Sequence, residues 1–189
     1  MNRSRNQRIS PMKAATHRII HPVNRRNRQS LSVRIECRMS DKEVNVEITC
    51  DIEALEVDTG KLEELAGQIC GRFGVCPVTV SIAIVGDEEM LRVNKEFLDS
   101  NEQTDVISFD LSDENETLKV FELVVNADQA LRQAQSRGHL QQAELALYIT
   151  HGLLHNLGFD DIDEEDARKM HAMEDKILQE AGYGIVYEK

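Results

Sequence analysis

Hydrophobic residues recur along the chain with two periods, which predict strands and helices. Short alternating or continuous apolar runs indicate strands, whereas apolar positions three and four residues apart indicate helices. The pattern predicts strands at residues 44–50, 78–85, 106–109 and 118–126. It predicts helices at residues 59–73, 87–98, 127–137, 140–157 and 164–181. Four strands and five helices in this order are typical of an α+β domain, in which the helices pack on a small sheet.

Residues that favour helix ends mark the boundaries of these helices. The predicted N-caps are Asp58 or Thr59, Asp87 and Asp163. Glycines follow three of the helical patterns, at Gly74, Gly138 and Gly158. Glycine accepts the left-handed conformation in which many helices end, so these positions are predicted helix stops.

Charge is distributed unevenly along the chain. The formal net charge is −12, yet residues 1–30 carry eight Lys or Arg and no Asp or Glu. The rest of the chain is therefore strongly acidic, and it binds nucleic acid poorly unless a local groove, a metal ion or the basic segment attracts the phosphates. Residues 1–40 are predicted to be a basic, disordered tail, and residues 41–189 the folded domain.

Two interpretations of this tail remain open. It is either an arm that contacts RNA, or a stretch that is absent from the native protein. The second interpretation rests on Met39, which stands just before the predicted domain and could be the true start.

Cysteine usage and hydropathy favour a cytoplasmic protein. The cysteines at positions 37, 50, 70 and 76 show no Cys-x-x-Cys spacing, which favours neutral thiols in a reducing compartment over a disulfide or metal role. There is no run of about 18 apolar residues that would predict a membrane helix. The N-terminus also lacks the apolar core of a secretory signal.

The strongest chemical signal is a histidine pair on the helix at 140–157. His151 and His155 are four residues apart, so both imidazoles project from one helix face and can reach one ion. Gly158 ends the helix, and Asp161 follows three residues later, where the chain can fold back. These residues predict a zinc site with three protein ligands and an open fourth position, which is typical of catalytic zinc. The alternative is a histidine pair on a helix face without a metal.

The same spacing occurs in metzincin proteases, but the residue after the first histidine argues against a peptidase. Those enzymes carry a glutamate there as the general base. In this chain the position is Gly152, which cannot transfer a proton.

Two blocks of the sequence resemble the YbeY family of bacterial single-strand-specific metallo-endoribonucleases. The segment from His151 to Asp160 is similar to the family signature H-G-x-L-H-L-x-G-Y-D-H. The segments Asn94–Leu98 and Gln103–Phe109 resemble N-x-x-Y-R followed by P-T-D-V-L-S-F. The resemblance extends from about Val44 to Glu188 and implies a zincin-like architecture with a mixed sheet beside the metal helix.

Several positions depart from the family pattern. Asp161 stands where the third metal ligand of the family is His; carboxylate is an accepted zinc ligand, but its charge makes the ion a weaker Lewis acid. Leu98 replaces an arginine thought to assist catalysis, and Gln103 replaces a proline. Lys95, one helical turn before Leu98, is a candidate for the missing positive charge, with Arg92 as a second candidate.

Thr104, Asp105 and Ser108 match the second block and are candidates for lining a groove that holds single-stranded RNA. The competing interpretation is that Thr104 and Asp105 only shape a tight loop before a strand. Asp160 is a candidate for orienting a ligating histidine. His139 and His171 are interpreted as surface or partly buried residues.

The resemblance implies a zinc-dependent endoribonuclease that matures the 3′ end of small-subunit ribosomal RNA and takes part in ribosome quality control. Its partners would be ribosomal RNA and the small ribosomal subunit, with no membrane. In this interpretation His151, His155 and Asp161 act through the metal. The alternative is a non-catalytic, metal-stabilised ribosome assembly factor, which Leu98 favours. A metallopeptidase is a weaker third possibility.

Overall fold

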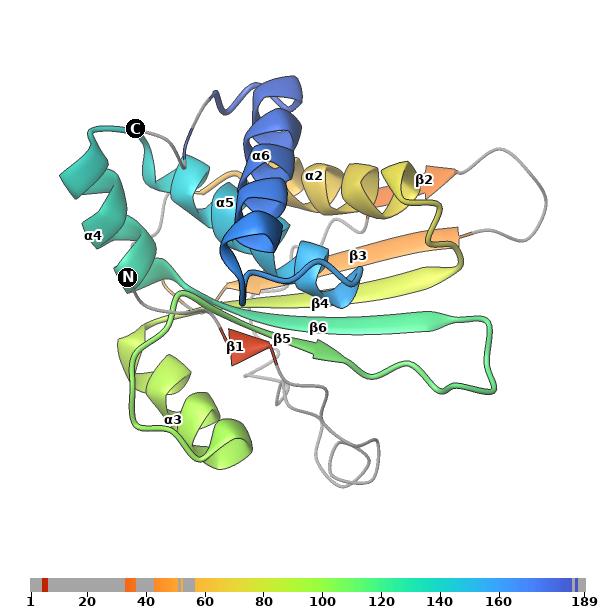
Figure 1. Cartoon of the computed structure of the whole chain (residues 1–189), viewed down its shortest axis with the longest axis horizontal. Coiled ribbons are helices and arrows are strands. Elements are labelled where there is room, and N and C mark those ends of the chain that lie inside the picture. The colour runs from red at the N-terminus through yellow and green to blue at the C-terminus, as the bar shows by residue number, and fades with distance from the viewer. Residues whose placement is uncertain are drawn as a thin grey trace.

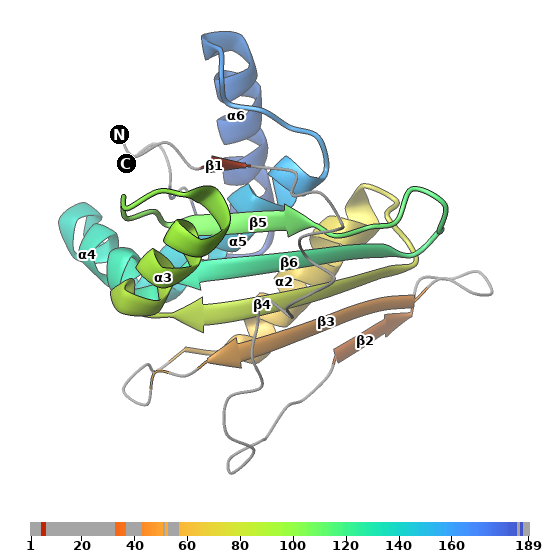
Figure 2. The ribbon, with the colours of Figure 1, turned by 90° about the horizontal axis from the view of Figure 1, so that it is seen from below.

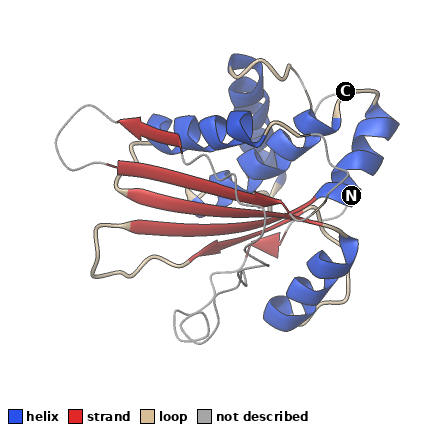
Figure 3. Ribbon diagram, turned by 180° about the vertical axis from the view of Figure 1, so that it is seen from behind, coloured by secondary structure: helices blue, strands red, loops and turns tan. Residues whose placement is uncertain are grey.

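The computed structural model describes most of the predicted domain and two short pieces before it (Figure 3). The described residues are 5–6, 33–36, 43–50, 52, 57–184 and 186. The remaining positions of the predicted tail, with Met39 and Cys37, lie outside the described residues. The disorder predicted for residues 1–40 stays a prediction for these positions, whereas residues 5–6 and 33–36 of the same range form short strands.

Four strands form the body of a mixed sheet. They are β3 (Glu43–Cys50), β4 (Val78–Val85), β5 (Val106–Asp110) and β6 (Lys119–Asn126). β3, β4 and β6 run parallel, and β5 pairs antiparallel with β6. Two short strands from the N-terminal region extend the edges, giving the order β1-β5-β6-β4-β3-β2. They are β1 (Arg5–Asn6), parallel to β5, and β2 (Val33–Glu36), antiparallel to β3.

Five helices, within the described residues, cover this sheet on both faces. They are α2 (Thr59–Arg72), α3 (Asp87–Leu98), α4 (Ala127–Arg137), α5 (Gln141–Asn156) and α6 (Glu164–Glu180). α3 lies on one side of the sheet and the other helices lie on the opposite side (Figures 1 and 2). The predicted α+β class, the mixed sheet and the helices are confirmed. Among the described residues no helix is both long enough and apolar enough to cross a bilayer.

The alternation of side chains along β4 separates two hydrophobic cores. Ile82 and Ile84 pack in the larger core, which includes buried residues of α2, α5 and α6. Ala83 and Val85 point the other way, into a smaller core under α3. Successive strand residues face opposite sides of a sheet, so an almost continuous apolar strand is what a sheet covered on both faces requires.

The predicted cap of α3 is wrong, whereas Asp58 and Asp163 cap α2 and α6 as expected. Gly86 is the N-cap of α3, and the N–H of Asp87 donates to Asp128 Oδ2 at 2.9 Å. The Asp87 carboxylate instead accepts from the Arg132 guanidinium through both of its oxygens, at 2.7 and 2.9 Å. The hydrogen bond from Arg132 is the main reason why the pKa of Asp87 is lowered.

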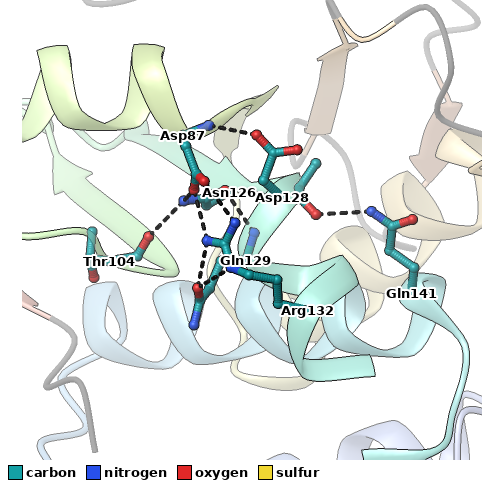
Figure 4. A network of polar contacts seen from close by, with 8 residues as sticks. Asp87, Thr104, Asn126, Asp128, Gln129, Arg132 and Gln141 are labelled. Atoms are coloured by element: carbon teal, nitrogen blue, oxygen red, sulfur yellow. Dashed lines mark hydrogen bonds and ion pairs between the residues drawn. The ribbon is translucent and has the colours of Figure 1, made fainter. Parts of the chain in front are cut away.

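The same network anchors the loop that leads into β5 (Figure 4). Asn126 is fully buried, and its side-chain amide donates to Asp87 Oδ1 at 2.9 Å and to the carbonyl of Thr104 at 3.2 Å. The backbone N–H of Asn126 donates to the carbonyl of Asp105 at 2.8 Å. These hydrogen bonds therefore fix the start of β5 to the end of β6.

Gly152 lets α5 lie close to the sheet. A Cβ atom at this position would come within 2.9 Å of Leu123 Cδ2 and 3.0 Å of Val106 Cγ2. These atoms belong to the central core, where neighbours have little room to move. A side chain after His151 would therefore crowd the core and require these neighbours to shift.

We expect Gly152→Ala to lower the free energy of unfolding by about 1–3 kcal/mol, because the added methyl group overpacks the core. Gly71→Ala is the matched control: it also lies in a helix, and its added Cβ would meet nothing within 4 Å. That substitution should be neutral or stabilising by about 0.5–1 kcal/mol. Urea unfolding measures both effects, and equal changes at the two positions would contradict the packing argument.

Candidate metal centre

His151 and His155 come together on the last turns of α5. Their Nε2 atoms lie 3.0 Å apart, and both residues are buried. The helix ends at Asn156, and Gly158 follows with a φ of +93°, a conformation that favours glycine. The N–H of Gly158 donates to the carbonyl of His155 at 3.0 Å. The chain then turns back toward the histidines.

This turn brings Asp161 to the histidine pair. Asp161 Oδ1 lies 3.9 Å from His155 Nε2, and one donor atom from each of the three residues lies within 4.8 Å of the others. We refer to His151, His155 and Asp161 as the metal group. In the part of the chain that the structure describes, it is the one cluster of three such side chains able to hold a metal ion.

The outer nitrogens of both imidazoles are bound to acceptors. His151 Nδ1 lies 2.6 Å from Glu174 Oε1, and His155 Nδ1 lies 3.1 Å from the carbonyl oxygen of Phe159. A carboxylate and a carbonyl only accept, so each Nδ1 carries the ring proton. In neutral imidazoles both Nε2 atoms then carry lone pairs, 3.0 Å apart, and the Asp161 carboxylate lies 3.9 Å from one of them. Three lone-pair donors this close together fit a divalent cation.

A proton competes with a metal ion for this position. Burial alone would lower the pKa of His151, but the hydrogen bond to Glu174 and the charges of Glu174, Asp105 and Asp161 outweigh it and raise that pKa. Burial, followed by the charge of His151, lowers the pKa of His155. Ligating histidines must be neutral, so metal binding releases protons from the site.

Glu174 is the site residue that the sequence analysis missed. It lies on α6, is fully buried, and also accepts from His171 Nδ1 at 2.9 Å. Burial would raise the pKa of Glu174, but the hydrogen bonds from His151 and His171 lower it, so the carboxylate stays charged. A signal was present, because Glu174 interrupts the buried stripe of Met170, Ile177 and Leu178. A charged residue within an apolar stripe is buried only with partners.

The atom that orients His155 is a backbone carbonyl rather than the predicted Asp160 carboxylate. Asp160 is exposed, and its Oδ1 accepts from the N–H of Asp161 at 2.8 Å. Asp160 therefore shapes the turn that carries Asp161, while the Phe159 carbonyl holds the imidazole.

Two of the predicted groove residues lie at the start of β5, beside α5. Asp105 Oδ1 accepts from the N–H of Val106 at 2.9 Å and from the Thr104 hydroxyl at 3.1 Å. These contacts shape the turn into the strand, as the competing interpretation expected. The charge of Asp105 also reaches His151 and raises its pKa. Asp105 therefore lies near the metal group, and Ser108 is buried on the strand face that it shares with Val106. An RNA-binding role for Thr104, Asp105 and Ser108 stays a prediction.

Leu98 and Lys95 lie on α3, across the sheet from α5 (Figure 2). Leu98 is buried in the smaller core with Phe109 and Val93. Lys95 is exposed, and its catalytic role stays a prediction. Arg92, the second candidate, forms ion pairs with Glu89 and Glu96 at 2.7 and 2.6 Å.

We expect Glu174→Gln to weaken zinc binding by roughly 10- to 100-fold, because an amide orients His151 less firmly than a carboxylate and adds no negative charge. Glu165→Gln is the control, because Glu165 is exposed on the same helix and pairs only at the surface with Lys169. Competition with a chromophoric chelator measures both affinities. Unchanged zinc affinity in Glu174→Gln, in a protein that remains folded, would rule out this supporting role.

Comparisons with known proteins agree with this site and fold. Residues 47–182 match a family model described as endoribonuclease YbeY. An endoribonuclease YbeY from Nitratiruptor is 36% identical over 135 residues, which cover 71% of this chain and 88% of that relative. A protein of the same name from Bacillus pumilus is 37% identical over 114 residues, covering 54% of this chain and 72% of the relative.

A solved structure supports the fold independently of close sequence similarity. The solution structure of TM1509 from Thermotoga maritima matches 71% of this chain and 90% of its own, with a TM-score of 0.50 at 21% identity. At this identity the match shows a common fold. Because the family model spans most of the chain and the relatives exceed one third identity, this chain belongs to the YbeY family.

Proposed function

We propose that this protein is a zinc-dependent endoribonuclease that cuts single-stranded RNA at the metal group. The observation that carries the proposal is the placement of one ligand atom each of His151, His155 and Asp161 within 4.8 Å of one another. The names of its relatives supply the reaction class, since several are called endoribonuclease YbeY.

The residues of this chain have separate tasks at such a site. His151 and His155 bind the ion through Nε2, and Glu174 and the Phe159 carbonyl keep the ring protons on Nδ1. Asp161, on the turn after Gly158, completes the set of protein ligands and leaves room for substrate or water. Zinc bound there supplies either activation of a water molecule or polarisation of a phosphate oxygen. The negative charge of Asp161 makes that effect weaker than in a site of three histidines.

The proposed substrate is the precursor of small-subunit ribosomal RNA, cut near its 3′ end in the cytoplasm, with a further role in ribosome quality control. This proposal follows from the family resemblance, and the charge of the chain limits how the RNA can be recognised. A protein with a net charge of −12 gains little from general attraction to RNA, so recognition has to be local. A bound cation beside an acidic surface provides such a local contact for phosphate.

A non-catalytic ribosome assembly factor is the second candidate, and the burial of Leu98 favours it. A leucine in the hydrophobic core cannot stabilise charge on a phosphate. In that case the metal would hold α5 and the turn together without cutting RNA. A peptidase is disfavoured because Gly152 stands where such enzymes carry their glutamate base, and any side chain there would crowd Leu123 and Val106.

We expect the zinc-loaded protein to cleave precursor small-subunit ribosomal RNA, and we expect cleavage to stop with a chelator or in His151→Ala. Gel analysis of a labelled precursor measures the products. His171→Ala is a useful comparison, since His171 donates to Glu174 but does not belong to the metal group, so its loss should reduce the rate less than loss of a ligand. Folded, zinc-loaded protein that leaves the precursor intact would favour the assembly factor instead.

A further inference from the structure

Ile162 is an exposed aliphatic residue directly beside the metal group. Its exposed fraction is 85%, the highest of the large hydrophobic residues that the structure describes as exposed. It follows Asp161 in the chain, so the two Cα atoms are about 3.8 Å apart. Single exposed aliphatic residues are common on protein surfaces. The position of Ile162, next to a candidate ligand, distinguishes it from the others.

The backbone on both sides of Ile162 is fixed by hydrogen bonds. The N–H of Asp161 donates to Asp160 Oδ1 at 2.8 Å. On the other side, Asp163 Oδ1 accepts from the N–H groups of Glu165 and Asp166, both at 2.9 Å, and so caps α6. Ile162 is therefore held in an ordered turn between a candidate metal ligand and a helix cap.

All residues of this segment except Ile162 are acidic. From Asp160 to Asp166 the sequence reads Asp-Asp-Ile-Asp-Glu-Glu-Asp. Carboxylates repel the phosphates of RNA, so the sugar-phosphate backbone is disfavoured along this surface except at a bound cation. A nucleobase carries no charge and presents a flat, weakly polar face. Ile162 is the one side chain of the segment that can contact such a face without the cost of removing water from a carboxylate.

We propose that Ile162 contacts an unpaired nucleobase next to the phosphodiester bound at the metal group, and that this contact contributes to the preference for single-stranded RNA. The inference rests on the proposed function. In a duplex the base faces are stacked inside the helix, whereas unpaired bases can turn outward onto protein side chains. A duplex that approaches the acidic segment presents phosphates and no free base face.

The test compares Ile162→Ser with Leu140→Ser in zinc-loaded protein. Leu140 is also exposed, at 76%, but it is the N-cap of α5 and lies about 16 Å from His151 along the helix. The probe is a fluorescent single-stranded oligoribonucleotide, used whole and in versions with one abasic nucleotide at each position in turn. Fluorescence anisotropy gives the dissociation constant, and gel analysis of the same samples gives cleavage.

We expect Ile162→Ser to weaken binding of the whole oligonucleotide roughly five-fold, as the loss of a partly buried aliphatic contact predicts. Leu140→Ser should bind RNA and zinc as the wild type does, and its melting temperature should be equal or higher, because serine is favoured at an N-cap. Ile162→Ser should keep the wild-type melting temperature and zinc affinity. One abasic position should weaken wild-type binding by a similar factor and leave the affinity of Ile162→Ser unchanged. That loss of sensitivity identifies a base contact, which a general structural defect would not produce.

Equal affinities of Ile162→Ser and wild type would overturn the inference, and so would an equal loss in Leu140→Ser. Binding without cleavage would contradict the proposed enzyme activity, yet the abasic series would still decide the role of Ile162. If the folded, zinc-loaded wild type binds no single-stranded RNA, both the proposed function and the inference fail.

Discussion

The hydrogen bond between His151 and Glu174 is the contact on which the candidate site depends. It joins α5 to α6, and it fixes the ring proton of His151 on Nδ1 so that Nε2 faces His155. A fully buried carboxylate is costly unless it is paired, and two histidines pair with Glu174. The carboxylate therefore has a structural reason to stay charged, and its charge in turn favours a cation at the metal group.

Packing against the sheet sets the position of α5 and therefore of its two histidines. Gly152 allows the helix to approach Val106 and Leu123, and this close packing brings the start of β5 near His151. The buried amide of Asn126 ties the loop before β5 to the sheet and, through Asp87 and Arg132, to α3 and α4. Packing and polar contacts thus place Asp105 beside the metal group, although it is distant from the histidines in the sequence.

The negative charge of the domain limits where its surface can bind RNA phosphates. The described domain is acidic, and the segment after Gly158 is almost entirely so. A metal ion at the histidine pair would be a focus of positive charge within a repulsive surface, which suits recognition of one phosphate rather than of a long backbone. The buried position of Leu98 adds to this constraint, because α3 offers no arginine at that place.

The sequence by itself determined the four central strands, the five helices and the ligand spacing, but not the two short edge strands. Helix and strand periodicities are local properties, so 44–50, 78–85 and the five helices could be recognised from hydrophobic patterns, as could the histidine pair on one helix face. Tertiary structure alone decided which partners these residues meet. Glu174 is 23 positions after His151 in the sequence. Asp128 accepts from the first N–H of α3, at Asp87, which is 41 positions earlier in the chain. Such contacts depend on how helices cross and strands pair, and no local sequence pattern encodes these arrangements. An apolar stripe shows that a helix face is buried, but it does not show which residue of another element lies against that face.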